Sequence, residues 1–262
     1  MTPGREGPAA HDLRCHRGRL ISVEGISGVG KTHLTGQLLE RHTSDGFVVL
    51  EEFSQRHHTD DNDLGRDLLR ILIAAANGDP FLRSGHPGTE TLLLLAIKTF
   101  DYENGSATAL AQGRTVIEGR SVHSTAVYQS LIVHPDDQSA YQHAQLILDL
   151  AARWRPLPDL TILITDDMTA AIRRAETRDG IRYTEQQWQL HRRADALFGR
   201  LAADDPQRLT VLDRRRLTND QLIDQMADHI AAASPRCLAE TVNRTTAPAR
   251  CSQDCQPQHA ER

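Results

Sequence analysis

Residues Gly25 to Thr32 carry the clearest chemical signal in this chain of 262 residues. They match the pattern G-x-x-x-x-G-K-[ST] and stand between a short apolar run and a helical pattern. Glycines let the backbone curl until several N–H groups point into one concavity, which the positive end of the next helix also faces. Lys31 would then reach the β- and γ-phosphates of a nucleotide, and the Thr32 hydroxyl would hold Mg²⁺. The expected phosphate-binding set is Gly25, Ser27, Gly28, Val29, Gly30, Lys31 and Thr32.

The scarcity of lysine supports this interpretation. Of the 30 basic residues, 28 are Arg, and the only two lysines are Lys31 and Lys98. The planar fork of arginine does not replace a compact ammonium in a phosphate cradle. We therefore interpret Lys31 as a residue retained for chemistry.

Apolar periodicity places this motif in an alternation of strands and helices. Strands are expected at 19–24, 47–50, 114–118, 160–164 and 209–212. Helices are expected at 31–42, 64–73, 89–112 with a bend near 104–105, 122–132, 138–153, 169–177, 184–203 and 219–233. In the helix at 64–73 we expect Leu64, Leu68, Leu69, Leu72 and Ile73 to form one buried face. The opening β-loop-α-β order predicts a doubly wound parallel sheet.

Composition narrows the class of protein. Residues 1–18 are interpreted as a flexible leader, 19–233 as one α/β domain and 234–262 as a disordered tail. The net charge of −5 argues against a nucleic-acid-wrapping protein. No run is long enough for a membrane span or a signal peptide, and the four cysteines lie near the chain ends, so a cytoplasmic location is expected. In the tail, Cys251, Cys255 and His259 lack clear further partners for a zinc site.

Two further groups could complete a phosphoryl-transfer site. Glu118 ends the expected third strand, at the sheet edge where it could hold a water of the Mg²⁺ shell. An arginine-rich segment between the fourth strand and the next long helix could form a lid that stabilises transferred charge. Its candidate residues are Arg174, Arg178 and Arg182.

The order of several short motifs, from about Arg19 to Ala233, resembles that of thymidylate kinases. They are Val23-Glu24-Gly25, Leu64-Gly65, Ala109-Leu110-Ala111-Gln112-Gly113-Arg114, Gly119-Arg120-Ser121 with Ser124 and Tyr128-Gln129, and Pro158-Asp159-Leu160-Thr161. The resemblance implies a P-loop NTPase fold of three layers, with a five-stranded parallel sheet flanked by helices. It also implies an ATP- and Mg²⁺-dependent kinase that phosphorylates a nucleoside monophosphate, with dTMP to dTDP as the leading reaction, and a homodimer.

By position, the resemblance assigns an acceptor site. Arg120 would hold the acceptor phosphate, Tyr128 and Gln129 would line the acceptor pocket, and the arginines of the lid would cover ATP. Leu94 stands where the family has the phenylalanine that stacks on thymine, and Lys98 stands where it has the arginine that reads the base. Ser27 replaces the acidic residue of the loop that meets the deoxyribose, and Gly119-Arg120 replaces an Asp-Arg pair.

These departures leave other functions open. Glu51-Glu52-Phe53 replaces an Arg-Glu-Pro segment, and deoxynucleoside kinases place a catalytic glutamate at this point. Glu51 or Glu52 would then be the general base for a sugar hydroxyl, since a carboxylate repels a monophosphate. A kinase acting on another small hydroxyl compound is a third possibility. Outside enzymes, a nucleotide-dependent switch would use the same loop to change a partner surface.

Overall fold

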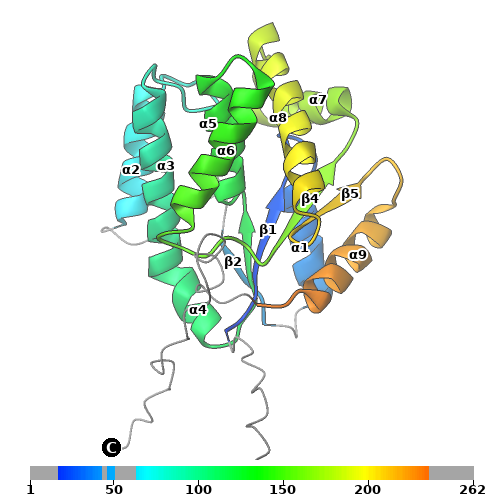
Figure 1. Ribbon diagram of the computed structural model, residues 1–262. Helices are drawn as coiled ribbons and strands as arrows, with labels where there is room; N and C mark the ends of the chain where they lie inside the picture. Colours follow the sequence, from blue (N-terminus) through cyan, green and yellow to red (C-terminus); the bar gives the residue numbers. More distant parts are fainter. Residues whose placement is uncertain (1–16, 43–45, 51–62, 236–262) are drawn as a thin grey trace, which may run out of the picture.

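Five parallel strands form one sheet, in the order β2-β3-β1-β4-β5 (Figure 1). The computed structural model describes residues 17–42, 46–50 and 63–235. The strands are β1 (Leu20–Glu24), β2 (Val48–Leu50), β3 (Val116–Gly119), β4 (Leu160–Thr165) and β5 (Leu209–Asp213). The predicted five-stranded α/β fold is therefore confirmed.

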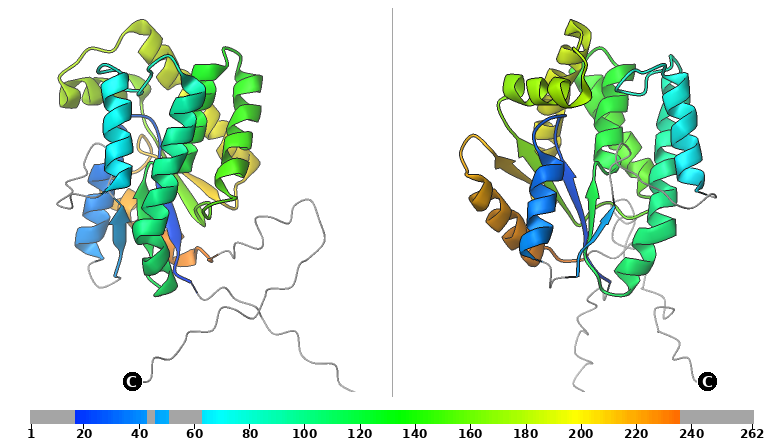
Figure 2. Two further views of the ribbon diagram at one scale, coloured as in Figure 1. Left: turned by 90° about the vertical axis from the view of Figure 1, so that its left-hand side faces the viewer. Right: turned by 180° about the vertical axis from the view of Figure 1, so that it is seen from behind.

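Helices cover both faces of the sheet. They are α1 (Lys31–Arg41), α2 (Leu64–Ala75), α3 (Pro87–Asp101), α4 (Ala107–Ala111), α5 (Val122–Val133), α6 (Asp137–Ala151), α7 (Met168–Asp179), α8 (Glu185–Asp204) and α9 (Asn219–Ala232). Figures 1 and 2 show α1 and α9 together on one face, and α5, α6 and α8 on the other. The sheet edge that carries the carboxyl ends of the strands thus lies between these two layers.

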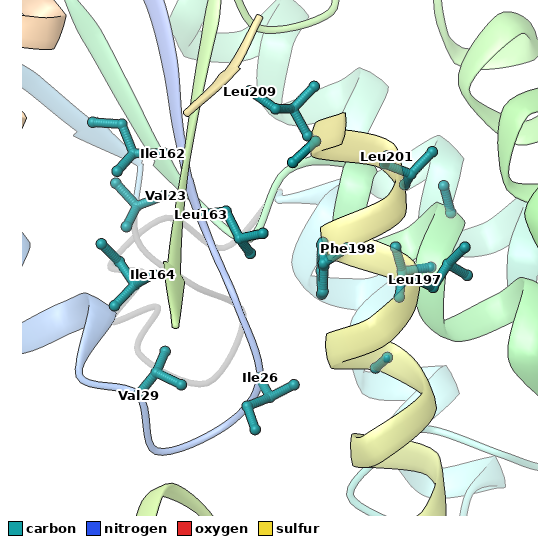
Figure 3. Packing of buried hydrophobic residues seen from close by; sticks show 14 of the residues in the cluster. Val23, Ile26, Val29, Ile162, Leu163, Ile164, Leu197, Phe198, Leu201 and Leu209 are labelled. Atoms are coloured by element: carbon teal, nitrogen blue, oxygen red, sulfur yellow. The ribbon is translucent and has the colours of Figure 1, made fainter. Parts of the chain in front are cut away.

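The core follows from the alternation of side chains along the strands. Ile162 and Ile164 point to one face of β4, while Leu163 points to the face where α8 packs (Figure 3). From α8, the buried Phe198 points toward the sheet in this view, while the buried Leu197 lies on the other side of the helix. The strands β1 and β4 are buried along nearly their whole length, which explains why their sequences are largely apolar runs.

The long helix expected at 89–112 is interrupted near its predicted bend. A π-helical segment, η3 (Tyr102–Ser106), separates α3 from α4. The segment contains Asn104 and Gly105, two weak helix formers. The interruption was therefore readable from the sequence.

One prediction of local structure was wrong. Leu64 and Ile73, placed on the buried face of α2, are 55% and 51% exposed. The helix buries only a narrow stripe that includes Leu69 and Leu72, because the element it packs against most is α3. The helix expected at 169–177 is confirmed as α7, which contains Arg174 and extends far enough to include Arg178 before Gly180 ends it in a left-handed conformation.

The described part of the chain extends two residues before the predicted domain boundary. Arg17 forms a bidentate ion pair with the buried Asp159, at 2.8 and 2.7 Å, and the Gly18 amide donates to the Leu110 carbonyl. A Cβ at Gly18 would lie 1.8 Å from the Arg114 carbonyl oxygen, so only glycine fits there. Residues 1–16 and 236–262, which hold most of the predicted leader and tail, lie outside the described residues. Among the described helices, none is both long and apolar enough to cross a bilayer.

A buried ion pair joins β3 to the segment before β4. Arg155, with a fully buried side chain, donates to both carboxylate oxygens of Glu118 at 2.8 and 2.9 Å. Its other terminal nitrogen donates to the Lys98 carbonyl at 3.1 Å, and its guanidinium lies 5.6 Å from the centre of the Tyr102 ring. Arg155 therefore ties α3 and η3 to the sheet.

Removing one member of this pair should destabilise the protein strongly. Arg155→Met leaves the Glu118 carboxylate buried without its cation, which costs roughly 3–5 kcal/mol of unfolding free energy. The double variant Arg155→Met with Glu118→Leu should recover most of that loss, because no charge stays buried. Urea denaturation measures both, and a single variant within about 1 kcal/mol of the wild type would contradict the structural role.

The buried imidazole of His123 predicts how the stability of the protein responds to acid. Burial lowers the pKa of His123 to about 3, helped by the Arg208 and Arg155 guanidinium groups. The unfolded chain binds a proton at this residue below about pH 6.5, while the folded chain does not until about pH 3. Stability should therefore fall as the pH falls from about 6.5 toward 3, by up to about 1.4 kcal/mol per pH unit from this residue.

His123→Asn should flatten that slope, because asparagine keeps a polar atom near the Nδ1 position and does not titrate. The same substitution at the exposed His33 serves as the control. Denaturant titrations between pH 4 and pH 7 provide the measurement. Equal slopes in the wild type and His123→Asn would rule out His123 as a source of acid sensitivity.

Candidate active site

The loop between β1 and α1 has the backbone that a phosphate cradle needs. Gly25, Gly28 and Gly30 have φ values of +133°, +82° and +95°, a range that favours glycine. At Gly28 a Cβ would also lie 1.8 Å from the Ala171 carbonyl oxygen. The Lys31 ammonium, on a buried side chain, donates to the carbonyls of Gly25 and Ile26 at 3.0 and 3.1 Å. Lys31 therefore lies folded over the loop, while Thr32 is exposed at the start of α1.

Two arginines hold this loop from the side of β4 and β5. Arg174 of α7 donates to the Gly28 carbonyl at 2.9 Å, and Arg214, just after β5, donates to the Val29 carbonyl at 2.8 Å. Both guanidinium groups also face Asp166, which forms an ion pair with Arg174 and lies 3.8 Å from Arg214. Arg174 was predicted at this site. Arg214 and Asp166 were missed, although the Arg214-Arg215-Arg216 run after a strand was a usable signal.

The other two arginines of the predicted lid lie on α7 and just beyond it. Arg178 forms an ion pair with Asp179 at 2.6 Å, and Arg182, 91% exposed, lies 3.5 Å from Glu176. These ion pairs thus lie within the α7 region and do not involve the loop. Their role over ATP stays a prediction.

Arg120 brings the acceptor side of the site to the loop. It follows β3 with φ of +60°, an uncommon conformation for a residue with a side chain. Its guanidinium donates to Ser27 Oγ at 2.9 Å and hydrogen bonds the hydroxyl of Tyr128. The predicted acceptor residue Arg120 and the loop residue Ser27 are therefore in direct contact.

The Glu24 carboxylate fixes the two loops relative to each other. Fully buried at the end of β1, it accepts hydrogen bonds on Oε1 from Ser22 Oγ at 2.8 Å and from the amide and hydroxyl of Ser121 at 2.6 and 2.8 Å. Its Oε2 accepts from Ser124 Oγ at 2.6 Å. These donors span β1 and the start of α5, so the carboxylate holds the backbone on both sides of Arg120. Sequence reasoning missed Glu24 as part of the site, although its place just before the loop was visible.

The predicted acceptor residues divide into two groups. Tyr128 is buried beside Arg120, as described. Leu94 packs with Leu69 and Leu72 between α2 and α3, and the Gln129 side chain accepts from Thr91 Oγ1 of α3 at 3.1 Å. Lys98, also on α3, is buried. Contact of these three with an acceptor stays a prediction.

Four rings from three regions of the chain meet next to Arg120. The His191 ring of α8 lies 5.1 Å from Phe81, 5.4 Å from Tyr183 and 6.1 Å from Tyr128, measured between centroids. Burial raises the pKa of Tyr128 to about 12 and that of Tyr183 to about 12. Burial, together with Arg120 and Lys31, lowers the pKa of His191 to about 3. No sequence signal could have predicted this cluster, because its members come from three regions of the chain: the α2–α3 connection, α5, and residues 183–191.

Of the described residues considered as metal ligands, only Thr32 lies where it could bind a metal without breaking another contact. Thr32 is suitably located on the loop, whereas both carboxylate oxygens of Glu118 accept from Arg155, so a metal role would compete with that ion pair. Glu51 and Glu52 lie outside the described residues. Within the described ranges, no group of three or more His, Cys, Asp or Glu side chains could hold a metal ion by itself. The loop thus fits a metal bound jointly with nucleotide phosphates, for which one hydroxyl ligand is sufficient.

Comparison with known proteins agrees with this geometry. A family profile described as thymidylate kinase matches residues 23–222. A thymidylate kinase from Bradyrhizobium sp. strain BTAi1 is 28% identical over 232 residues, which cover 83% of this chain and 95% of that protein. One from Chromobacterium violaceum is 32% identical over 204 residues, covering 76% of this chain and 88% of its own.

Solved structures support the same fold. The crystal structure of thymidylate kinase from Ehrlichia chaffeensis superposes with a TM-score of 0.55 at 22% identity, covering 80% of this chain and 99% of that one. Thymidylate kinase from Candida albicans superposes with a TM-score of 0.58 at 18% identity, covering 82% and 92% of the two chains. At these identities the likeness identifies the fold, which is that of P-loop NTPases.

Glu24→Gln should impair the site through Arg120. An amide offers one acceptor oxygen where the carboxylate serves four donors, so the segment around Arg120 loses hydrogen bonds that hold its left-handed backbone. We expect kcat/KM for the acceptor to fall by about tenfold or more, and stability to fall by about 1–3 kcal/mol. Steady-state kinetics and thermal denaturation measure the two effects. An unchanged kcat/KM for the acceptor would contradict this positioning role.

Proposed function

The chain belongs to the thymidylate kinase family, and from this premise we propose that it transfers the γ-phosphoryl group of ATP to the phosphate of dTMP, yielding dTDP and ADP. The observation that carries this proposal is the contact between the two phosphate-binding halves of the site. Arg120 Nη2 and Ser27 Oγ are 2.9 Å apart, so the cation expected to hold the acceptor phosphate adjoins the loop expected to hold the donor phosphates. Such proximity is what a direct, in-line transfer requires.

The residues of the chain divide the work of the transfer. The acceptor phosphate oxygen forms a bond to the γ-phosphorus while the bond from that phosphorus to the β-γ bridging oxygen breaks, leaving ADP. Lys31 leaves the loop carbonyls to neutralise charge on the β- and γ-phosphates, and the loop amides bind the same oxygens. Arg120 orients the acceptor phosphate, and Arg174, Arg178 and Arg182 stabilise charge on the transferred group.

A divalent cation is part of this proposal. Thr32 would hold Mg²⁺ together with oxygens of ATP, and the ion would neutralise charge that develops between the β- and γ-phosphates. We keep Glu118 as a proposed indirect ligand, reached through a water. Its ion pair with Arg155 makes it the weaker of the two candidates.

Other functions receive less support. The deoxynucleoside kinase alternative depends on Glu51 or Glu52, and the relatives described above are named as thymidylate kinases. A nucleotide-dependent switch would not need Arg120 beside the loop.

We also propose a homodimer. The exposed apolar side chains of Leu64 and Ile71 on α2, Leu92 on α3 and Leu146 on α6 offer a candidate surface for it.

Lys31→Ala should reduce turnover by at least about 100- to 1,000-fold, because it removes a cation aimed at the charge that develops during transfer. ADP formation is measured with ATP, Mg²⁺ and, in parallel, dTMP, thymidine and other nucleosides and monophosphates. Arg41→Ala, at the far end of the same helix and paired with Asp220 on the surface, is the matched control and should retain activity. An active Lys31→Ala variant would overturn the assignment, and turnover of thymidine in place of dTMP would favour the deoxynucleoside kinase.

A further inference from the structure

His191 is a fully buried polar side chain that the mechanism above does not use. Its ring, on α8, is 0% exposed and is enclosed by Phe81, Tyr128 and Tyr183. Its Nδ1 lies 3.3 Å from the hydroxyl of Tyr128. The ring therefore borders the acceptor side of the site while belonging to a helix on which no site residue was predicted.

The hydrogen bonds of Tyr128 determine which nitrogen of His191 carries the proton. The Tyr128 oxygen accepts a hydrogen bond from the Arg120 guanidinium, which can only donate. The Tyr128 proton is then free to point at His191 Nδ1, which accepts it. Burial beside the cations Arg120 and Lys31 keeps the imidazole neutral, so its single proton lies on Nε2.

This Nε2–H group is a donor without an acceptor. Among the described residues, Nε2 is buried and has no hydrogen-bond partner. A buried donor left unpaired costs folding free energy, and such groups in native proteins often serve a ligand. Arg120 and Lys31, two cations of the candidate site, both lower the pKa of this ring, which agrees with its position beside Tyr128.

We propose that His191 determines acceptor specificity by donating a hydrogen bond from Nε2 to a carbonyl oxygen of the acceptor's base. This inference rests on the proposed function and extends it to recognition of the base. The neighbouring rings suit a planar base, and Phe81, which covers His191, is only partly buried on the connection between α2 and α3. The Asp79 carboxylate accepts a hydrogen bond from the Phe81 amide at 2.7 Å, which holds Phe81 in this position.

The pyrimidine is also the part of the acceptor left without an obvious partner. Leu94 packs in the α2–α3 cluster and has no ring to stack on a base. Phe81, Tyr183 and His191 supply rings next to Tyr128. A site built from them would read a base through stacking and one directional hydrogen bond.

The test compares His191→Phe and His191→Gln with the wild type. Phenylalanine keeps a ring and removes the donor, so the KM for dTMP should rise about 3- to 10-fold, the range expected for one hydrogen bond. The KM for ATP should stay within about twofold. His191→Gln carries an amide nitrogen that can reach the Nε2 position, so it should recover most of the affinity for dTMP. His143→Phe, on α6 and beside His134, makes the same change away from the site and should leave both KM values unchanged.

Base analogues test the same contact without relying on a variant that must fold. Analogues of dTMP that lack the 2- or the 4-carbonyl oxygen are compared in the wild type and in His191→Phe. One of them should lose affinity for the wild type and show no further loss in His191→Phe, because the two changes remove the same hydrogen bond.

The outcomes separate the two proposals. A wild-type enzyme that does not phosphorylate dTMP overturns the proposed function. Normal wild-type turnover with an unchanged KM for dTMP in His191→Phe overturns the role of His191 alone. If the wild type binds both analogues as tightly as dTMP, the role of His191 is also overturned. A raised melting temperature of His191→Phe together with a raised KM for dTMP would support a donor kept for the ligand at a cost in stability.

Discussion

The arrangement of the site depends on one buried carboxylate. Glu24 ends β1 and accepts hydrogen bonds from Ser121 and Ser124, which open α5, so a single side chain joins the donor loop to the acceptor segment. Because Ser121 adjoins Arg120, these bonds help to hold Arg120 in its left-handed conformation. A backbone of this kind persists only where the surroundings over-determine it. The contact of Arg120 with Ser27 therefore follows from the position of Glu24.

The cations near this carboxylate each donate a hydrogen bond to a carbonyl of the loop, and a bound nucleotide could take the place of that carbonyl. Lys31, Arg174 and Arg214 all donate to carbonyls of the loop, and Asp166 lies between the two arginines. Nucleotide phosphates can replace these neutral acceptors at little cost, since the side chains are already directed at the loop. The site is thus organised in advance for negative charge, as electrostatic catalysis requires.

Buried polar groups elsewhere divide into satisfied and unsatisfied ones. Arg155 and Glu118 satisfy each other and fix α3 and η3 against the sheet, a structural use of charge. His191 is different: one nitrogen contacts Tyr128 and the other has no partner among the described residues. Since both groups are equally deep, burial alone does not distinguish structural from functional polar residues. The distinction comes from whether the hydrogen bonds are complete within the protein.

The sequence by itself determined the strands, most helices and the glycine loop before α1, because these depend on local periodicity and on a motif with fixed spacing. The roles of the loop and of Arg120 in binding phosphate stay predictions. The sequence also located the interruption at Asn104-Gly105, since weak helix formers act locally. The exposed side of α2, the pairing of Glu118 with Arg155 and the meeting of Phe81, Tyr183 and His191 were decided only by the tertiary structure. Each depends on which surfaces pack together in the folded chain, as for Glu118 and Arg155, which are 37 residues apart. Spacing along the sequence carries no information about such contacts, because the sheet order that creates them is a property of the whole fold.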